Sequence, residues 1–246
     1  MTLRFHEIAE SGHRILNPLT GAKLGLLGDI CRPPHGARHL DLACGKGELV
    51  CRWAQRFGTA GVGVDISQVF LRAAVARAHE LGVSDAVRFV HGDAGAYGAE
   101  RHAFDVVSCL GATWIGGGLV GTLDLMRAAL TQDGLLLVGE PYWIDPPPAA
   151  AIDAVGAGED FTDLAGTLER FHAAGVELVE MVLADGDSWD RYVAAQWRTL
   201  DDWLRAHPDD PDRVALRDWH VANQRTYLEY GRRFLGWGVF VLRHAG

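Results

Sequence analysis

Five short apolar runs constrain the fold of this chain more than any other feature. They occupy residues 37–43, 60–66, 87–93, 104–111 and 134–140. Helical patterns separate several of them, at 47–57, at 67–81 behind a Ser67 cap, and at 121–130 before the turn sequence TQDG. Strands that alternate with helices favour βαβ units and a parallel sheet covered on both faces. We therefore predict an α/β protein with an open, doubly wound sheet.

The last third of the chain continues this pattern with longer helical segments. Two more strands are expected at 176–184 and 236–244, and one helix at 162–174. A helix from Ser188 to Ala206, with Ser188 as its expected cap, carries an apolar stripe: Trp189, Val193, Trp197, Leu200 and Leu204. The next helix is expected to have Asp210 as its cap, Pro211 in its first position and Gly231 beyond its end.

Two insertions interrupt the strand pattern, a Pro- and Gly-rich one at 143–160 and a helical one at 185–232. We expect both to lie as lids over the C-terminal edge of the sheet, where open α/β sheets bind ligands.

Composition excludes several classes of protein. The 246 residues are 48% hydrophobic, which suits one large domain. The net charge of −9 has the wrong sign for binding nucleic acid. No apolar run reaches the roughly 20 residues that cross a membrane, and the N-terminus lacks the apolar region of a secretory signal. The four cysteines show no metal-ligand spacing, so we predict no metal site and a cytoplasmic location.

The sequence DLACGKGELV (41–50) joins a strand to a helix through a glycine-rich loop. Only Gly45 and Gly47 match the dinucleotide fingerprint, because Val50 replaces the third glycine. Asp41 and Glu48 would repel a pyrophosphate at the helix N-terminus, and the lysine–serine pair of a phosphate-binding P-loop is absent. These acids instead suit S-adenosylmethionine, which has a sulfonium and an ammonium group and no phosphate.

Three acids follow three successive strands and converge on one crevice. Asp41 can attract the ammonium group of the cofactor. Asp65, about twenty residues later, stands where a carboxylate binds ribose hydroxyls. Asp93 can accept a hydrogen bond from the adenine amino group. Each acid alone is also compatible with a turn or helix cap, so the argument depends on the set.

At this point the sequence resembles the class I S-adenosylmethionine-dependent methyltransferases. The matching segments are DLACGKG (41–47), GVDIS (63–67), GDA (92–94), FDVV (104–107) and GLLLVGE (134–140). SGHRILNP (11–18), GATWIGGG (111–118), GEPYW (139–143), MVLAD (181–185) and WDRY (189–192) are similar to a bacterial subgroup of predicted methyltransferases. Ala43 stands where the family often has glycine.

The resemblance implies a Rossmann-like seven-stranded sheet of order 3-2-1-4-5-7-6 with its last strand antiparallel. It implies a single methyltransferase domain over 1–246 whose N-terminal segment, 1–35, covers the cofactor. The cofactor-binding residues that it implies are Asp41, Ala43, Gly45, Gly47, Asp65, Ile66, Asp93, Ala94 and Leu110.

Methyl transfer from a sulfonium is an in-line displacement, so the protein mainly aligns the acceptor and excludes water. A base is needed only if the acceptor atom carries a proton. We predict Glu140 and His13 as catalytic residues, because a carboxylate at the end of a central strand is costly to bury without a task. The expected acceptor-binding residues are Trp114, Tyr142, Trp143, His220 and Tyr227.

Each of these residues also has a structural alternative. Glu140 can cap a turn, His13 can be structural, and the tryptophans can pack a lid. His220, Asn223 and Tyr227 can form a solvated helix face. For the whole chain, a small-molecule methyltransferase is favoured, because lids close the crevice against a polymer. The alternatives are a non-catalytic module that binds S-adenosylmethionine and a nicotinamide-dependent oxidoreductase.

Overall fold

A seven-stranded sheet of order β3-β2-β1-β4-β5-β7-β6 forms the centre of the molecule. The computed structural model describes residues 2–156 and 161–246. The strands are β1 (Arg38–Leu42), β2 (Ala60–Asp65), β3 (Val87–His91), β4 (Phe104–Leu110), β5 (Leu130–Trp143), β6 (Val176–Leu183) and β7 (Leu235–His244). The first five pair in parallel, and β7 lies antiparallel between β5 and β6. The predicted strand order and the antiparallel last strand are confirmed.

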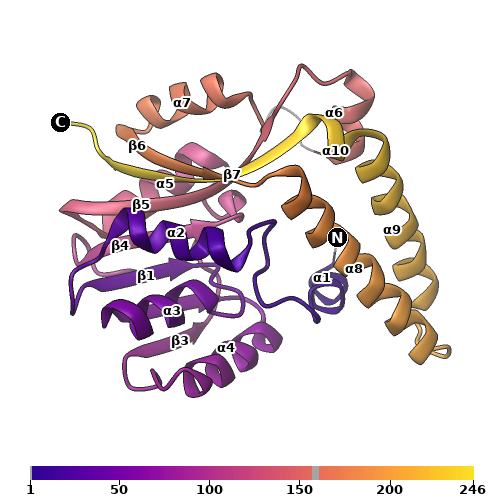
Figure 1. Cartoon of the computed structure of the whole chain (residues 1–246), viewed down its shortest axis with the longest axis horizontal. Coiled ribbons are helices and arrows are strands. Elements are labelled where there is room, and N and C mark those ends of the chain that lie inside the picture. The colour runs from indigo at the N-terminus through magenta and orange to yellow at the C-terminus, as the bar shows by residue number, and fades with distance from the viewer. Residues whose placement is uncertain (1, 157–160) are drawn as a thin grey trace.

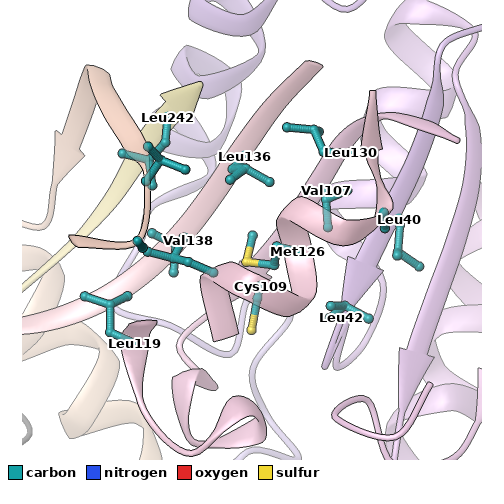
Figure 2. Close-up of a cluster of buried hydrophobic side chains, with 14 of the residues drawn as sticks. Leu40, Leu42, Val107, Cys109, Leu119, Met126, Leu130, Leu136, Val138 and Leu242 are labelled. Atoms are coloured by element: carbon teal, nitrogen blue, oxygen red, sulfur yellow. The ribbon is translucent and has the colours of Figure 1, made fainter. Parts of the chain in front are cut away.

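Helices cover both faces of the sheet. One layer contains α2 (Gly21–Cys31), α3 (Glu48–Phe57) and α4 (Gln68–Glu80), and the other contains α5 (Leu119–Ala129) and α7 (Leu164–Ala173). Figure 2 shows the second layer, where Met126 and Leu119 of α5 meet side chains of β1, β4, β5 and β7. On the other face, α2 and α3 bury Leu27 and Trp53 against Val239 of β7. These two apolar interfaces fix the positions of the strands, and the predicted site residues lie at the ends of those strands.

The remaining helices gather at one end of the sheet (Figure 1). They are α1 (Leu3–Ala9), the 3-10 turn η1 (Thr113–Gly116), α6 (Ala149–Val155), α8 (Gly186–Ala206), α9 (Arg213–Thr226), the π turn η2 (Tyr227–Gly231) and α10 (Arg232–Phe234). The N-terminal helix α1 packs against α8 through a small core of Ala9, Leu200, Leu204 and Leu216. Of the insertion expected at 143–160, residues 157–160 lie outside the described part of the chain.

Several predicted helix starts are wrong by a few residues. Ser67 does cap α4, but Ser188 does not cap α8. Asp185 does so instead, because its carboxylate accepts from both the amide and the hydroxyl of Ser188. The second lid helix begins at Arg213 rather than behind Asp210, whose carboxylate accepts from the Asp212 amide. Gly231 does not end it either, because the chain continues through η2 into α10.

The expected TQDG turn at 131–134 is also wrong, because these residues belong to β5. The ladder between β4 and β5 shifts register there: Phe104 pairs with Leu130, while Val106 pairs with Leu135. The extra residues of β5 form a bulge. A bulge lets a strand contain turn-type residues and still continue.

Helix α3 approaches β2 very closely, and Gly61 makes this possible. A Cβ atom on Gly61 would lie 2.2 Å from Cγ2 of Val50 and 3.0 Å from Cγ1 of Val87. The neighbouring inward position, Gly63, would meet Cys44 and Phe89 in the same way. Both glycines are therefore required by packing, although neither has a positive φ.

We expect Gly61→Ala to lower the free energy of unfolding by about 2 kcal/mol, because overpacking a dense interface forces shifts of backbone and side chains. Urea unfolding followed by circular dichroism would measure this. Gly25→Ala in α2, where nothing lies within 4 Å of the new Cβ, is the matched control. An equal effect of both substitutions would contradict the proposed close approach.

Candidate functional site

The loop between β1 and α3 is built from left-handed backbone. Ala43, Gly45 and Gly47 have φ values of 54°, 55° and 67°. This conformation costs an L-residue such as alanine roughly 1–2 kcal/mol, whereas glycine adopts it freely. A non-glycine residue held in this region is a strain that typically marks a functional turn. The loop also brings Gly45 against Leu16 of the N-terminal segment, where a Cβ would lie 2.7 Å from Cδ1.

Asp65 at the end of β2 holds this loop in place. One of its carboxylate oxygens accepts from the amide of Gly45 at 2.8 Å, and the other accepts from the amide of Ser67 at 2.8 Å. Burial raises the pKa of Asp65, and the two amides oppose that rise. The carboxylate thus caps two turns already, and its remaining lone pairs are those that a ribose would use.

Asp41 is the most deeply buried of the three acids predicted to bind the cofactor, with 3% of its surface exposed. Burial raises the pKa of its carboxyl to about 7, although the Ser108 hydroxyl donates a hydrogen bond to it. The charge of Asp65 adds to the rise. An ammonium group beside Asp41 would reverse this effect, because an opposite charge favours the ionised carboxylate.

The other predicted cofactor residues surround the same strand ends. Asp93 is exposed and caps the amide of Gly95 at 2.9 Å with one oxygen. Ala94 is buried, Leu110 at the end of β4 is partly buried, and Ile66 is 57% exposed after Asp65. The structure therefore brings these residues to one edge, and their contacts with a cofactor remain a prediction.

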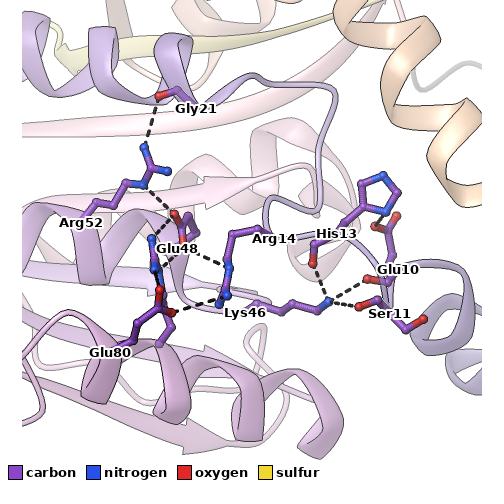
Figure 3. Close-up of polar contacts among 10 residues, drawn as sticks. Glu10, Ser11, His13, Arg14, Gly21, Lys46, Glu48, Arg52 and Glu80 are labelled. Atoms are coloured by element: carbon purple, nitrogen blue, oxygen red, sulfur yellow. Dashed lines mark hydrogen bonds and ion pairs between the residues drawn. The ribbon is translucent and has the colours of Figure 1, made fainter. Parts of the chain in front are cut away.

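Glu48, the second acid of the loop, has a structural task. Its buried carboxylate lies 2.6 Å from Nε of Arg52 and 2.8 Å from Nε of Arg77, with Arg14 at 4.0 Å (Figure 3). The charge is thus neutralised by arginines from α3, α4 and the N-terminal segment. This explains how an acid in the first turn of α3 is buried, and it agrees with leaving Glu48 out of the predicted site.

Lys46 connects the loop to the N-terminal segment. Its ammonium group donates to the main-chain carbonyls of Glu10, Ser11 and His13 (Figure 3). The one cation of the DLACGKG loop therefore points away from the three acids. These three hydrogen bonds hold residues 10–13 beside the glycine-rich loop.

The predicted catalytic residue His13 lies in this fastened segment with both ring nitrogens facing oxygens. Its Nε2 is 3.1 Å from the carbonyl of Tyr192 in α8, and its Nδ1 is 3.2 Å from Oε2 of Glu10. Nε2 is thus engaged by the carbonyl, whereas Nδ1 has no hydrogen-bond partner among the described residues and faces the Glu10 carboxylate. The contacts join the N-terminal segment to α8.

The other predicted catalytic residue, Glu140, is buried in β5 and accepts from the hydroxyl of Thr113 at 2.6 Å. Thr113 follows β4, so the pair joins the two adjacent strand ends. Trp114, one residue further, is 73% exposed.

The other four residues predicted to bind the acceptor lie in different surroundings and do not form one cluster. Tyr142 is buried in the sheet core, and Trp143 packs with Ala151 and Phe234 under α6. His220 is buried on α9, and its Nδ1 has no hydrogen-bond partner in the described part of the chain. Tyr227 donates its hydroxyl to Asp190 at 2.8 Å.

A pocket of about 310 Å³ lies between α1, α6, α8 and α9. Its wall includes Tyr227 and Asn223 of the predicted helix stripe, but not His220. His6 also lines it, and the same ring packs on Phe70 of α4, at 5.4 Å between centroids. The pocket thus borders the cofactor edge through α1. A second, larger depression on the outer face of α9, around Val214 and Val221, contains none of the predicted site residues.

Comparison with known proteins decides the family. A family model described as a methyltransferase domain matches residues 40–134. The uncharacterized protein YjhP of Escherichia coli (strain K12) is 44% identical over 243 residues, which are 97% of this chain and 97% of that protein. The chain belongs to the S-adenosylmethionine-dependent methyltransferases. This enzyme class uses S-adenosylmethionine as its cofactor, so the nicotinamide alternative is set aside.

Two further relatives support this assignment. The crystal structure of a SAM-dependent methyltransferase from Geobacter sulfurreducens, in complex with S-adenosyl-L-homocysteine, superposes with a TM-score of 0.94. It is 45% identical and the match covers 99% of this chain and 98% of that one. Nocamycin O-methyltransferase of Saccharothrix syringae is 31% identical over 131 residues, 52% of this chain and 45% of its own length.

The charges of this methyltransferase fit the cofactor. Asp41, Asp65 and Asp93 supply carboxylates, and Lys46 is turned toward the N-terminal carbonyls. A cation such as a sulfonium or an ammonium suits this arrangement, whereas a phosphate would meet only acids.

Sequence reasoning did not identify four residues of this region: Glu10, Lys46, Tyr192 and Gln196. Tyr192 and Gln196 lie four residues apart on α8, so helical spacing places them on one face. Lys46 stands inside the recognised loop motif. Glu10 has no local signal, because only its contacts with α8 distinguish it from a surface acid.

We expect the affinity of the methyltransferase for S-adenosylhomocysteine to rise roughly tenfold between pH 6 and pH 7.5. Below its pKa of about 7, Asp41 is neutral and must lose a proton before it can pair with the ligand ammonium group. That ammonium is still mostly protonated at pH 7.5, since α-amino groups titrate near pH 7.7–8.0. Isothermal titration calorimetry across the range would measure the change.

Two variants isolate this effect. Asp41→Asn is expected to bind weakly and without the pH dependence. Ser108→Ala removes a hydrogen bond to the ionised carboxylate, so the rise is expected to move to higher pH. A pH-independent affinity in the unmodified protein would contradict the role of Asp41.

We expect Glu48→Gln to lower the free energy of unfolding by about 2 kcal/mol, because Arg52 and Arg77 lose the buried carboxylate that accepts their hydrogen bonds. The affinity for S-adenosylhomocysteine is expected to stay within about twofold. Urea unfolding and calorimetry would measure both. Glu80→Gln, which removes an exposed partner of the same Arg77, is the control and should leave the unfolding curve nearly unchanged. A large loss of cofactor affinity would overturn the structural assignment of Glu48.

Proposed function

We propose that this methyltransferase acts on a small-molecule acceptor that binds in the pocket between α1, α6, α8 and α9. The observation that carries the proposal is a pocket of about 310 Å³ bordered by the N-terminal helix and by helices of the two insertions. Pockets of this size hold small ligands. A polymer would require an open groove at the same edge. The match to nocamycin O-methyltransferase, whose name denotes an acceptor of this kind, supports the proposal.

In this proposal the residues of the sheet edge hold the cofactor, and those of the lid hold the acceptor. S-adenosylmethionine supplies an electrophilic methyl group when bound. Asp41 and Asp65 would pair with its ammonium group and its ribose, and Asp93 with its adenine. The lid and the N-terminal segment would align the acceptor and exclude water, which are the main requirements of an in-line displacement.

We further propose that Glu140, which does not line this pocket, orients the reacting end of the acceptor or accepts its proton at the edge of the sheet. Its burial in β5 and its hydrogen bond with Thr113 support this role, since both hold the carboxylate in a defined position. For His13 the contacts favour positioning over proton transfer, because its ring joins the N-terminal segment to α8.

The negative charge of the chain supports our expectation that nucleic acid is not its substrate. Among the described residues, no helix combines the length and the apolar character needed to span a membrane. We propose a cytoplasmic location, which agrees with the four unpaired thiols.

A labelling screen tests the proposed acceptor class. The protein would be incubated with S-adenosylmethionine carrying a labelled methyl group and with the low-molecular-weight fraction of a cell extract. Mass spectrometry is expected to find a small molecule that gains one methylene. Labelling of retained protein or nucleic acid, with no labelled small molecule, would contradict the proposal.

With that acceptor in hand, we expect Glu140→Gln to reduce kcat/KM at least about tenfold and to leave binding of S-adenosylhomocysteine within about twofold. Asp133→Asn, an acid substitution in the same strand but at its exposed far end, is the control. Undiminished turnover of the Glu140 variant would remove this residue from the mechanism.

A further inference from the structure

The acceptor pocket has an unusual distribution of charge. Aromatic rings from two lid helices and the π turn line it: Tyr192, Trp197, Trp219 and Tyr227. One carboxylate, that of Glu10, belongs to the wall. Among the described residues that line the pocket there is no lysine or arginine, and His6 is the one basic side chain. The wall is therefore aromatic with a single fixed negative charge.

Glu10 is fully buried, with 0% of its surface exposed. Its Oε1 accepts from the hydroxyl of Tyr192 and, at 2.6 Å, from the side-chain amide of Gln196. Its Oε2 has no hydrogen-bond partner in the described structure, and His13 Nδ1 lies 3.2 Å from it without hydrogen-bond geometry. Three side chains thus position a carboxylate whose second oxygen remains unsatisfied. Burial makes its charge act over a longer range than a surface charge would.

The aromatic rings pack against one another in the pocket wall. The centroids of Trp197 and Tyr227 are 6.0 Å apart at 69°, so one ring meets the other edge to face. Trp219 joins them from α9, and Tyr192 from α8 connects them to Glu10. Ring faces carry negative electrostatic potential and attract cations, most strongly when the site is shielded from water.

Cations near the pocket are directed elsewhere. Lys46 donates to the carbonyls of residues 10, 11 and 13 rather than to the Glu10 carboxylate. Arg232 pairs with Asp190, which also accepts from the Tyr227 hydroxyl. Among the described residues that line the pocket, the carboxylate of Glu10 is the negatively charged group, and Lys46 lies close enough outside the wall to interact with its charge.

We propose that this pocket recognises its acceptor by a positively charged nitrogen, held between the aromatic rings and drawn by the buried carboxylate of Glu10. The inference rests on the proposed function, since it names the chemical class of the same small-molecule acceptor. Glu10 would act through its charge and through the Tyr192 hydroxyl, whose oxygen it makes a better acceptor for an ammonium N–H.

The test uses the full chain saturated with S-adenosylhomocysteine, so that cofactor binding is verified in the same sample. The probes are choline and its neutral carbon analogue 3,3-dimethylbutan-1-ol, which have nearly the same shape. Tryptophan fluorescence and calorimetry would measure the two affinities. We expect choline to bind at least about tenfold more tightly, as a desolvated cation–π contact together with a fixed charge implies.

Two variants assign the preference to the pocket. Glu10→Gln and Trp197→Leu are each expected to reduce choline affinity about fivefold or more, with little change for the neutral analogue. Glu229→Gln, which removes a charge from the outward side of η2, is the matched control and should keep the preference. If Glu10→Gln does not bind S-adenosylhomocysteine normally, Trp197→Leu decides the outcome.

Equal affinity for the two probes, or no binding of choline by a protein that binds S-adenosylhomocysteine, would overturn the inference. So would a preference that survives the deciding variant. Each of these three results leaves the proposed function standing, because the labelling screen can still reveal a neutral acceptor. Failure of the proposed function would instead appear as labelling confined to macromolecules.

Discussion

The left-handed turn between β1 and α3 is the constraint on which the rest of the site depends. Its backbone places Ala43, Gly45 and Gly47 in a region that glycine tolerates and alanine occupies under strain. Because the turn is tight, the side chains around it are directed with little freedom. Lys46 reaches the N-terminal segment, Glu48 reaches three arginines, and the Gly45 amide meets Asp65.

The acids of the loop region therefore divide into two groups by their surroundings. Glu48 is neutralised by arginines and belongs to the scaffold. Within the described part of the chain Asp41 has no cationic partner, and burial raises its pKa to about 7. A carboxylate kept in that state is unfavourable unless a ligand provides the missing charge. The contrast explains why two acids that flank one loop can have different tasks.

A single chain of contacts joins the cofactor loop to the lid. Lys46 fastens residues 10–13, and the Glu10 carboxylate of that segment receives donors from Tyr192 and Gln196 of α8. The N-terminal segment thus contacts both the glycine-rich loop and the pocket proposed for the acceptor, and Figure 1 shows α1 packed beside α8 at the end of the sheet. Order in the cofactor loop and order in the acceptor pocket are consequently coupled through a few hydrogen bonds.

Much of the fold followed from the sequence alone, because alternating apolar runs and helical periodicity are local signals that tertiary contacts here reinforce. The glycine-rich loop, the positions of Asp41 and Asp65 at strand ends, and the cap at Ser67 were all predicted from such local signals.

Local signals were misleading where two side chains compete for the same role. Asp185 displaced Ser188 as a cap because its carboxylate is the better acceptor, and TQDG became a bulge because β4 pairs on both sides of it. Only the tertiary structure decided that Glu48 is structural and that His13 joins the N-terminal segment to α8. It also decided that His220 lies away from the pocket wall while Tyr227 lines it, and that Glu10 belongs to an aromatic pocket. The physical reason is that such roles depend on which charges and rings meet across segments nearly two hundred residues apart, as Glu10 and Gln196 do, and no local pattern records that meeting.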